Sequence, residues 1–369
     1  ASRGPRLELL MSKLLYVAAR SQGRLQLLGM SATVPNIELF ARWLRAELHH
    51  ESCRPQKLGV CVAFPSAPGR MSVVSVERLH AELQQLPLDP DIAPAPKGKG
   101  SDEGPRLAAT AALCAHLRQV SCAGVSILVF CRTKARTLEA AKAVVRAGGG
   151  KADRCHEVLT CADGWLREAV QVCDNAASDE YRAIWTLLDE ARTRGIRDNA
   201  DDAPSHLGRM LPLLARGVAY HHGDLKSLER ELVEALFRRG AIHTICSTST
   251  LAAGVNLPVD CVVIDGLQDG MSQALSAASL QQMIGRAGRG PPRAVSSSQG
   301  GSTLPLVGAY LAVSSRAEVG AAHTLHASKI ADTGSALRGQ LDLLTLFALK
   351  SQLARTVGQV EDFVGHSLF

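Results

Sequence analysis

The sequence predicts an α/β protein whose central element is a parallel β-sheet flanked by helices. From residue 106 onward, short apolar segments of strand length alternate with segments of helical periodicity. Hydrophobic residues make up 46% of the 369-residue chain, which is ample for a buried core, whereas aromatic residues make up only 4%. We therefore expect an aliphatic core, and the length allows two domains.

The first hundred residues show a less regular pattern. Asn36 is a plausible N-cap for a helix, and a short apolar run that ends at Ser31-Ala32-Thr33 has the character of a buried strand. The elements predicted here are helices over residues 7–19 and 36–48 and strands over residues 25–30, 57–64 and 71–76. Residues 87–105 are rich in proline, glycine and charge, and we expect them to form a mobile loop.

The remainder of the chain alternates strand and helix in the manner of a parallel sheet of the RecA or Rossmann kind. The predicted strands cover residues 126–130, 217–222, 243–246, 261–264 and 306–313. The predicted helices cover residues 107–120, 133–145 and 226–239, with further helix over 335–369. Residues 148–208 interrupt the alternation as a helical, cysteine-bearing insertion, and residues 290–303 form a second loop.

Charge and cysteine content narrow the class of protein. The net charge of +6 and the pI of about 8.8 are compatible with a nucleic-acid partner, although many enzymes share this balance. The ten cysteines form no Cys-x-x-Cys pair, and the grouping of Cys155, His156, Cys161 and Cys173 fits no common zinc spacing. Buried reduced thiols in an intracellular protein are therefore expected, with no metal site. No apolar run is long enough for a membrane span, so we expect no membrane partner.

Polar segments follow several of the predicted strands, where parallel sheets bind their ligands. These segments are Ser31–Thr33, Cys131–Lys134, Ser247–Asn256 and, after the last helix, Arg286–Arg289. Small hydroxyls and backbone amides can hold phosphates, and Gly254 permits close approach of a ligand. In the run Gln282–Arg289, two arginines three residues apart can project from one face of a short helix and bind phosphate with their forked guanidinium groups.

Together these segments resemble the second half of a superfamily 2 helicase motor, in the group that contains HELQ and the helicase-like domain of DNA polymerase theta. The matching segments, in the family's order, are Leu28–Thr33 (motif III), Val129–Lys134 (motif IV), Tyr220–Leu225 (motif IVa), Ser247–Pro258 (motif V) and Gln282–Arg289 (motif VI). Residues 51–58, with Arg54-Pro55, resemble the segment that crosses between the two motor domains. Motif IVa departs from the usual His-His-Ala-Gly-Leu, because Gly223-Asp224 replaces Ala-Gly.

The resemblance implies a role for each motif. Arg286 and Arg289 would act as arginine fingers on the terminal phosphates of ATP with Mg²⁺, and Gln282 would bind the nucleotide or its attacking water. Gly254 and Asn256 would also face the nucleotide. The residues that would contact the backbone of a tracked nucleic-acid strand are Thr133, His222, Thr248 and Thr250. Ser31 and Thr33 would couple hydrolysis to domain motion.

Two elements of a complete motor are not found in the sequence. No Gly-x-x-x-x-Gly-Lys-Ser/Thr run occurs, and Lys97–Ser101 lacks the first glycine of that pattern. The acidic magnesium motif is also missing, because Asp189-Glu190 lies between motifs IV and IVa, where its apolar spacing suits a helix. The family carries both elements before motif III. We therefore expect a fragment of a longer helicase that binds ATP poorly and hydrolyses none by itself.

The resemblance also suggests a domain organisation. The predicted domains are a C-terminal remnant of a first RecA-like domain (1–50), an interdomain crossover with a mobile loop (51–105), a second RecA-like, helicase C-terminal domain with the 148–208 insertion (106–315), and the start of a winged-helix domain (316–369). The implied partners are single-stranded or branched DNA and the N-terminal RecA-like domain of the same protein, and the implied compartment is the nucleus. An RNA helicase of the same superfamily and a non-catalytic nucleic-acid-binding module remain the alternatives.

Overall fold

The computed structural model separates into two compact units. The described residues are 3–20, 26–31, 34, 36–49, 58–67, 70–82, 103–120, 125–148, 206–214, 216–249, 251, 257–270, 273–289, 307–314, 316–330, 335, 337 and 341–367. Residues 55–328 form one unit, called the sheet unit here, and residues 1–54 with 329–369 form the other, called the end unit.

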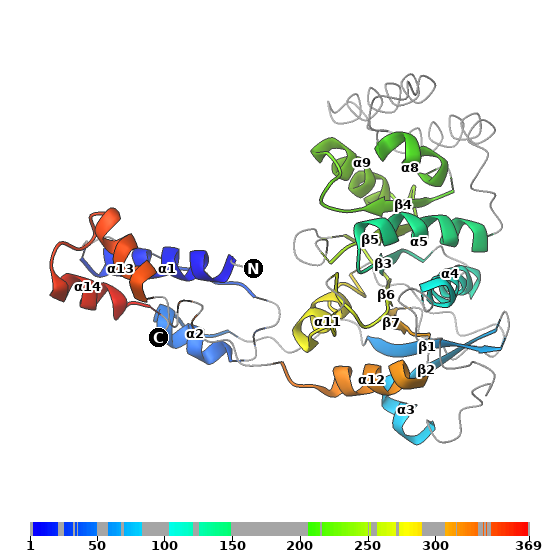
Figure 1. Ribbon diagram of the computed structural model, residues 1–369, viewed down its shortest axis with the longest axis horizontal. Coiled ribbons are helices and arrows are strands. Elements are labelled where there is room, and N and C mark those ends of the chain that lie inside the picture. The colour runs from blue at the N-terminus through cyan, green and yellow to red at the C-terminus, as the bar shows by residue number, and fades with distance from the viewer. Residues whose placement is uncertain are drawn as a thin grey trace. The chain divides into compact units, whose positions relative to one another are not determined.

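A seven-stranded sheet is the centre of the sheet unit (Figure 1), and its strand order is β2-β1-β7-β6-β3-β5-β4. The strands are β1 (Gly59–Ala67), β2 (Arg70–Ser75), β3 (Ile127–Phe130), β4 (Val218–His221), β5 (Thr244–Ser247), β6 (Cys261–Asp265) and β7 (Gly308–Ala312). All neighbouring strands are parallel except β1 and β2, which form an antiparallel hairpin at one end of the sheet. The predicted fold class, an α/β protein with a mainly parallel sheet flanked by helices, is confirmed.

Helices cover both faces of this sheet. The helices of the sheet unit are α3 (Val76–Glu82), α4 (Glu103–Val120), α5 (Lys134–Ala147), α8 (His206–Leu214), α9 (Ser227–Arg238), α11 (Ala277–Ile284) and α12 (Arg316–Ala327). Helices α4 and α5 lie side by side on one face, and α11 and α12 pack together on the other (Figure 1). The chain moves along the sheet in one direction through α4 and α5 and returns through α9 and α11, as right-handed crossovers require.

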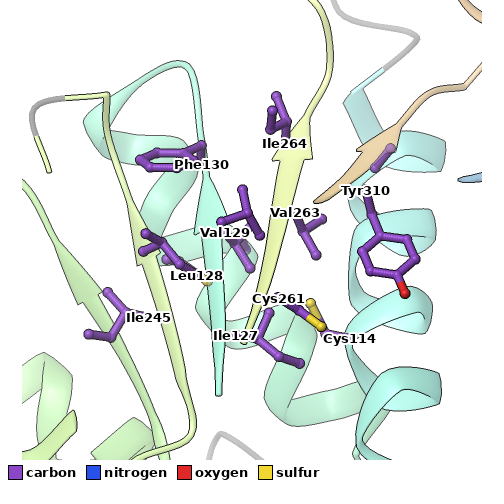
Figure 2. Close-up of a cluster of buried hydrophobic side chains, with 14 of the residues drawn as sticks. Cys114, Ile127, Leu128, Val129, Phe130, Ile245, Cys261, Val263, Ile264 and Tyr310 are labelled. Atoms are coloured by element: carbon purple, nitrogen blue, oxygen red, sulfur yellow. The ribbon is translucent and has the colours of Figure 1, made fainter. Parts of the chain in front are cut away.

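The core of the sheet unit is aliphatic, as predicted. Figure 2 shows β3 and β6 contributing Ile127, Leu128, Val129 and Val263 to one continuous cluster of buried side chains. Every residue of β3 is buried, because a parallel strand with helices on both faces has no solvent side. The five cysteines that the structure describes, Cys61, Cys114, Cys131, Cys246 and Cys261, are buried and free, as expected, and burial raises their pKa values. Cys155, His156, Cys161 and Cys173 lie outside the described residues.

The end unit joins the beginning of the chain to its end. It contains α1 (Arg3–Arg20), α2 (Ile37–Leu44), α13 (Leu341–Lys350) and α14 (Val357–Val364). The ring of Tyr16 on α1 packs edge-on against Phe363 on α14 with centroids 5.3 Å apart, and its hydroxyl donates to the Leu353 carbonyl at 3.1 Å. The indole of Trp43 donates to the His366 carbonyl at 2.9 Å. A small core therefore forms between segments more than 300 residues apart.

The strand predicted over residues 25–30 is wrong. Residues 26–31 adopt no regular secondary structure, and the side chains of Leu28 and Met30 are 85% and 88% exposed. A strand needs a partner for its backbone groups, and no strand that the structure describes pairs with this segment. The helix predicted to reach residue 48 ends at Leu44, because Arg45 adopts a left-handed conformation with φ of 51°; Asn36 occupies the N-cap position without a side-chain cap.

Some predicted boundaries differ from the compact units. Strands β1 and β2, placed in the 51–105 crossover by sequence, belong to the sheet, and α12, placed in the 316–369 segment, packs in the sheet unit. Most of the predicted loop over 87–105 and all of the loop over 290–303 lie outside the described residues, as do residues 149–205 of the insertion. The predicted assignment of domains to motor parts stays a prediction.

Two glycines of the sheet unit should respond to alanine in opposite ways. A Cβ on Gly308, where β7 pairs with β1, would clash with the Gly59 carbonyl oxygen, whereas a Cβ on Gly320 in α12 would meet nothing within 4 Å. We expect Gly308→Ala to lower the free energy of unfolding by about 1–3 kcal/mol, as overpacking does. Gly320→Ala should raise it by about 0.5–1 kcal/mol because alanine favours helix. Urea denaturation of the two variants measures both, and equal effects would contradict the β1–β7 contact.

Candidate nucleic-acid and nucleotide edges of the sheet

Three of the predicted nucleic-acid residues lie at the carboxyl edge of neighbouring strands. Thr133 follows β3, Thr248 follows β5 and His222 follows β4, and β5 lies between the other two strands. The Cys131 amide donates to the Ser247 carbonyl at 2.7 Å, and the Thr248 amide donates to the His221 carbonyl at 3.3 Å. The ladder thus continues past the strand ends and holds the three positions side by side.

Thr133 caps helix α5. Its Oγ1 accepts a hydrogen bond from the Arg136 amide at 3.2 Å, so the hydroxyl hydrogen remains able to donate to an anion. The first turn of α5 contains no acidic residue. Because helix N-termini carry partial positive charge and unpaired amides, this corner of the edge suits a phosphate.

His222 is held in one orientation and one tautomer. Its ring stacks on Tyr220 with centroids 5.5 Å apart and meets His206 edge-on at 5.2 Å. Its Nδ1 accepts from the Asp224 amide at 3.3 Å, so the proton of the neutral ring resides on Nε2. Burial, followed by the neighbouring His206, lowers the pKa of His222. The ring is therefore neutral near pH 7 and can donate a hydrogen bond from Nε2.

Thr248 is more enclosed than the sequence suggested. Only 8% of the residue is exposed, and its carbonyl accepts from the Ser247 hydroxyl at 3.0 Å. Thr250, the second hydroxyl predicted in this run, lies outside the described residues. His222 is also buried, with 4% of the residue exposed. The carboxyl edge therefore presents Thr133 and only small parts of His222 and Thr248.

An ion pair connects the two outer strand ends of this edge. The Lys134 ammonium, on the first residue of α5, lies 2.6 Å from Oδ1 of Asp224 in the turn after β4, and each side chain is 56% exposed. The hydrogen bond from Lys134, together with its charge, lowers the pKa of Asp224. In the sequence Asp224 stands out only as a departure from a motif, and nothing there indicates Lys134 as its partner.

The two arginines of the predicted phosphate site lie elsewhere. Helix α11 ends at Ile284, and Arg286 and Arg289 belong to the turns that follow, so the expected placement on one helical face is wrong. The Arg289 amide donates to the Val259 carbonyl at 3.0 Å, next to the start of β6. The arginines therefore lie at the amino edge of the sheet, whereas the sequence placed them at the carboxyl edge.

Local sequence explains this course of the chain. Ser276 caps α11 by accepting from the Ser279 amide at 3.2 Å, and the helix runs back along β6 with Leu280 and Met283 buried. Gly288 then adopts φ of +70°, which glycine accommodates without strain, and its amide donates to the Asp260 carbonyl at 3.3 Å. Such a reversal is what the connection between two parallel strands requires, so the alternation of strand and helix already implied it.

A polar network fixes the strand start on which the arginine turn rests. The buried Asp260 carboxylate accepts from the Ser126 amide at 2.9 Å and from the Ser126 hydroxyl at 2.7 Å. In turn, the Asp260 amide donates to the Ser126 hydroxyl oxygen at 2.9 Å. The amino ends of β3 and β6 are thereby joined beneath the backbone of Gly288 and Arg289.

The arginines are close enough to affect each other. Burial, and then the charge of Arg289, lowers the pKa of the half-buried Arg286. The Arg289 Nε donates to the Gly285 carbonyl at 3.1 Å, which holds its guanidinium over the turn. Two cations held together in this way are stabilised by an anion of high charge, such as a phosphate group. Gln282 is exposed on the last turn of α11, one helical turn before Arg286.

The other predicted site residues are not located. Gly254, Asn256 and Thr33 lie outside the described residues, and Ser31 is exposed in the end unit. Leu257–Asp260, the first described residues after Asn256, lie at the amino edge beside the arginine turn. The roles predicted for these residues stay predictions.

One buried ion pair was missed from the sequence. Arg136 Nε donates to Asp265 Oδ2 at 2.7 Å, and the Thr110 hydroxyl donates to Oδ1 at 2.9 Å. The side chains of Arg136 and Asp265 are only 6% and 1% exposed. The available signal was an aspartate directly after the apolar run 261–264. This pair fastens α5, which begins beside Thr133, to the end of β6.

Comparisons with known proteins identify similar sequences. Residues 201–291 match the family described as helicase conserved C-terminal domain. DNA polymerase theta of Mus musculus is 30% identical over 300 residues, which cover 78% of this chain and 10% of that protein. The ATP-dependent DNA helicase Hel308 of Pyrobaculum calidifontis is 31% identical over 293 residues, which cover 78% of this chain and 32% of that protein.

A relative named for RNA is also similar. The DExH-box ATP-dependent RNA helicase DExH12 of Arabidopsis thaliana is 26% identical over 293 residues, which cover 78% of this chain and 11% of that protein. The chain thus spans about a tenth to a third of the length of these relatives. Among the helices that the structure describes, none combines the length and apolar character of a membrane span.

Proposed function

Because this chain contains a superfamily 2 helicase C-terminal region of the polymerase theta and POLQ-like type, we propose that it is the C-terminal motor half of an ATP-dependent DNA helicase. The family predicted from the ordered motifs is confirmed. The proposed half binds single-stranded or branched DNA in DNA repair, in the nucleus, and supplies arginine fingers for ATP hydrolysis. It works with an N-terminal RecA-like domain of the same protein, and the 30% identity to a DNA polymerase supports DNA as the substrate.

The observation that carries this proposal is the separation of two anion-suited sites on opposite edges of one sheet. Thr133 and His222 lie at the carboxyl edge, and Arg286 and Arg289 lie at the amino edge. A motor needs this separation, because one strand must move while the nucleotide is turned over at another place. Contacts to phosphate are independent of base sequence, as translocation requires.

The described residues fit the phosphates of ATP better than its metal. Two neighbouring guanidinium groups and Gln282 offer only hydrogen-bond donors and a neutral amide. Among the residues with a described position, no group of three histidine, cysteine or carboxylate side chains could hold a cation. In the proposed mechanism Arg286 and Arg289 stabilise charge on the terminal phosphates. Mg²⁺ is then held by the N-terminal RecA-like domain.

Binding of labelled single-stranded DNA to the chain tests the nucleic-acid edge. Thr248→Val removes a hydroxyl at nearly constant volume, and loss of one hydrogen bond should weaken binding by about fivefold. The matched control is Arg286→Ala with Arg289→Ala, which removes two positive charges from the amino edge and should leave affinity within about twofold. Fluorescence anisotropy measures both. A larger loss in the arginine variant than in Thr248→Val would overturn the proposed separation of edges.

Two alternatives have direct tests. The 26% identity to a protein named RNA helicase favours an RNA substrate as the second candidate. Competition between DNA and RNA strands of one sequence decides between them, because only RNA offers a 2′-hydroxyl. A non-catalytic module is favoured if the gene sequence preceding Ala1 encodes neither a phosphate-binding lysine loop nor an acidic magnesium motif within about 200 residues, roughly one domain.

A further inference from the structure

The Lys134–Asp224 ion pair occupies the part of the carboxyl edge that is best suited to a phosphate. Lys134 is the first residue of α5, directly after the capping Thr133, and its ammonium is half exposed. The carboxylate of Asp224 lies 2.6 Å from that ammonium. A negative group therefore stands where the cation and the helix N-terminus together attract negative charge.

Backbone geometry does not require glycine where Asp224 stands. Among the described residues, left-handed φ values occur at two non-glycine positions, Arg45 and Gln352, and Asp224 is not one of them. The backbone therefore does not restrict the residue type at position 224, and the contacts of the side chain can determine it.

Asp224, and not His222, carries the negative charge beside Lys134. His222 is neutral near pH 7, and its Nδ1 is engaged by the Asp224 amide. Asp224 stays ionised at neutral pH because its hydrogen bond with Lys134 lowers its pKa. An exposed ion pair of this kind is weak in water, so a strongly charged phosphate can displace the carboxylate.

We propose that Asp224 competes with nucleic-acid phosphate for Lys134 and thereby sets the strength and salt dependence of binding at the carboxyl edge. This inference rests on the proposed function and assigns a role to two residues of the same site. A phosphate that binds Lys134 must displace the Asp224 carboxylate from it. The displaced carboxylate then repels the bound strand and needs a counterion of its own. Binding of the strand is therefore weaker, and fewer counterions are released from it, than if Lys134 had no carboxylate partner.

The test is a double-mutant cycle on the chain with labelled single-stranded DNA. Asp224→Asn should tighten binding about threefold at low ionic strength, the effect of a unit charge at roughly 7 Å in water. The plot of log K against log salt should steepen by up to about 0.7, the value for one further phosphate contact on a single strand. Asp224→Gly should reproduce both changes. Glu361→Gln, which removes the same charge from α14 of the end unit, is the matched control and should change neither.

Lys134→Met completes the cycle. It should have little effect when Asp224 is present. When Asp224 is asparagine, it should remove the steeper salt slope and weaken binding, because the extra phosphate contact depends on Lys134. If the wild-type chain binds DNA and neither Asp224→Asn nor Asp224→Gly changes that binding, Asp224 does not compete with phosphate for Lys134. The proposed function is unaffected by that result. An equal loss from Lys134→Met in both backgrounds also overturns it. No binding by any variant, Asp224→Asn included, overturns the nucleic-acid assignment together with this inference.

Discussion

Replacing Arg286 with alanine in the full-length protein should lower DNA-stimulated ATP hydrolysis by about 10³-fold or more, the effect expected for loss of an arginine finger. The proposed reason is electrostatic, since charge would develop on the terminal phosphates in the transition state and a guanidinium beside them would stabilise it. The turn that carries Arg286 is held by the hydrogen bonds of Gly288 and Arg289 to the start of β6. Steady-state ATPase assays with and without single-stranded DNA measure the effect.

Two control variants make this result specific. Arg286→Lys keeps the positive charge but loses the planar fork, so it should recover only part of the rate. Arg146→Ala removes an exposed arginine from the last turn of α5 and should leave the rate unchanged. Affinity for single-stranded DNA should be the same in all three variants. Normal turnover in Arg286→Ala would exclude the arginine-finger role.

The parts of the fold that sequence could predict are those fixed by local pattern. Strands β3, β5 and β6 were predicted to within one residue at each end. For β3 and most of β6 the reason is that a strand covered on both faces is an uninterrupted apolar run. Thr133 was placed at the start of a helix because a helical segment follows a polar turn there, and the structure shows Thr133 as the N-cap of α5. Adjacent strand ends then brought Thr133, His222 and Thr248 to one edge.

The errors arose where long-range partners decide the outcome. The apolar run 25–30 has strand character, but no described strand accepts its backbone hydrogen bonds. The arginine pair was grouped with the segments at the carboxyl edge, although a helix between two parallel strands returns the chain to the amino edge, where the pair lies. Pairs such as Lys134–Asp224 and Arg136–Asp265 join residues 90 and 129 positions apart, and a single sequence contains no signal of which charges meet.

Asp265→Ala should lower the free energy of unfolding by about 3–5 kcal/mol, because it leaves the buried guanidinium of Arg136 without its counterion. Burial alone lowers the pKa of Arg136, but the hydrogen bond and charge of Asp265 more than offset this, so the pKa is raised. The aspartate also accepts from Thr110 on α4, so one carboxylate joins α4, α5 and β6. Urea denaturation followed by circular dichroism at 222 nm measures the change.

Matched variants separate the charge from the packing at this position. Thr110→Val removes one neutral hydrogen bond and should lower stability by only about 1 kcal/mol. The double variant Arg136→Met with Asp265→Leu removes both charges at similar volume and should recover most of the loss, since apolar residues often replace a buried ion pair without penalty. A loss below about 1 kcal/mol in Asp265→Ala would mean that water reaches Arg136 in solution. Because α5 begins at Lys134, loosening this pair should also weaken binding at the carboxyl edge while leaving the amino edge intact.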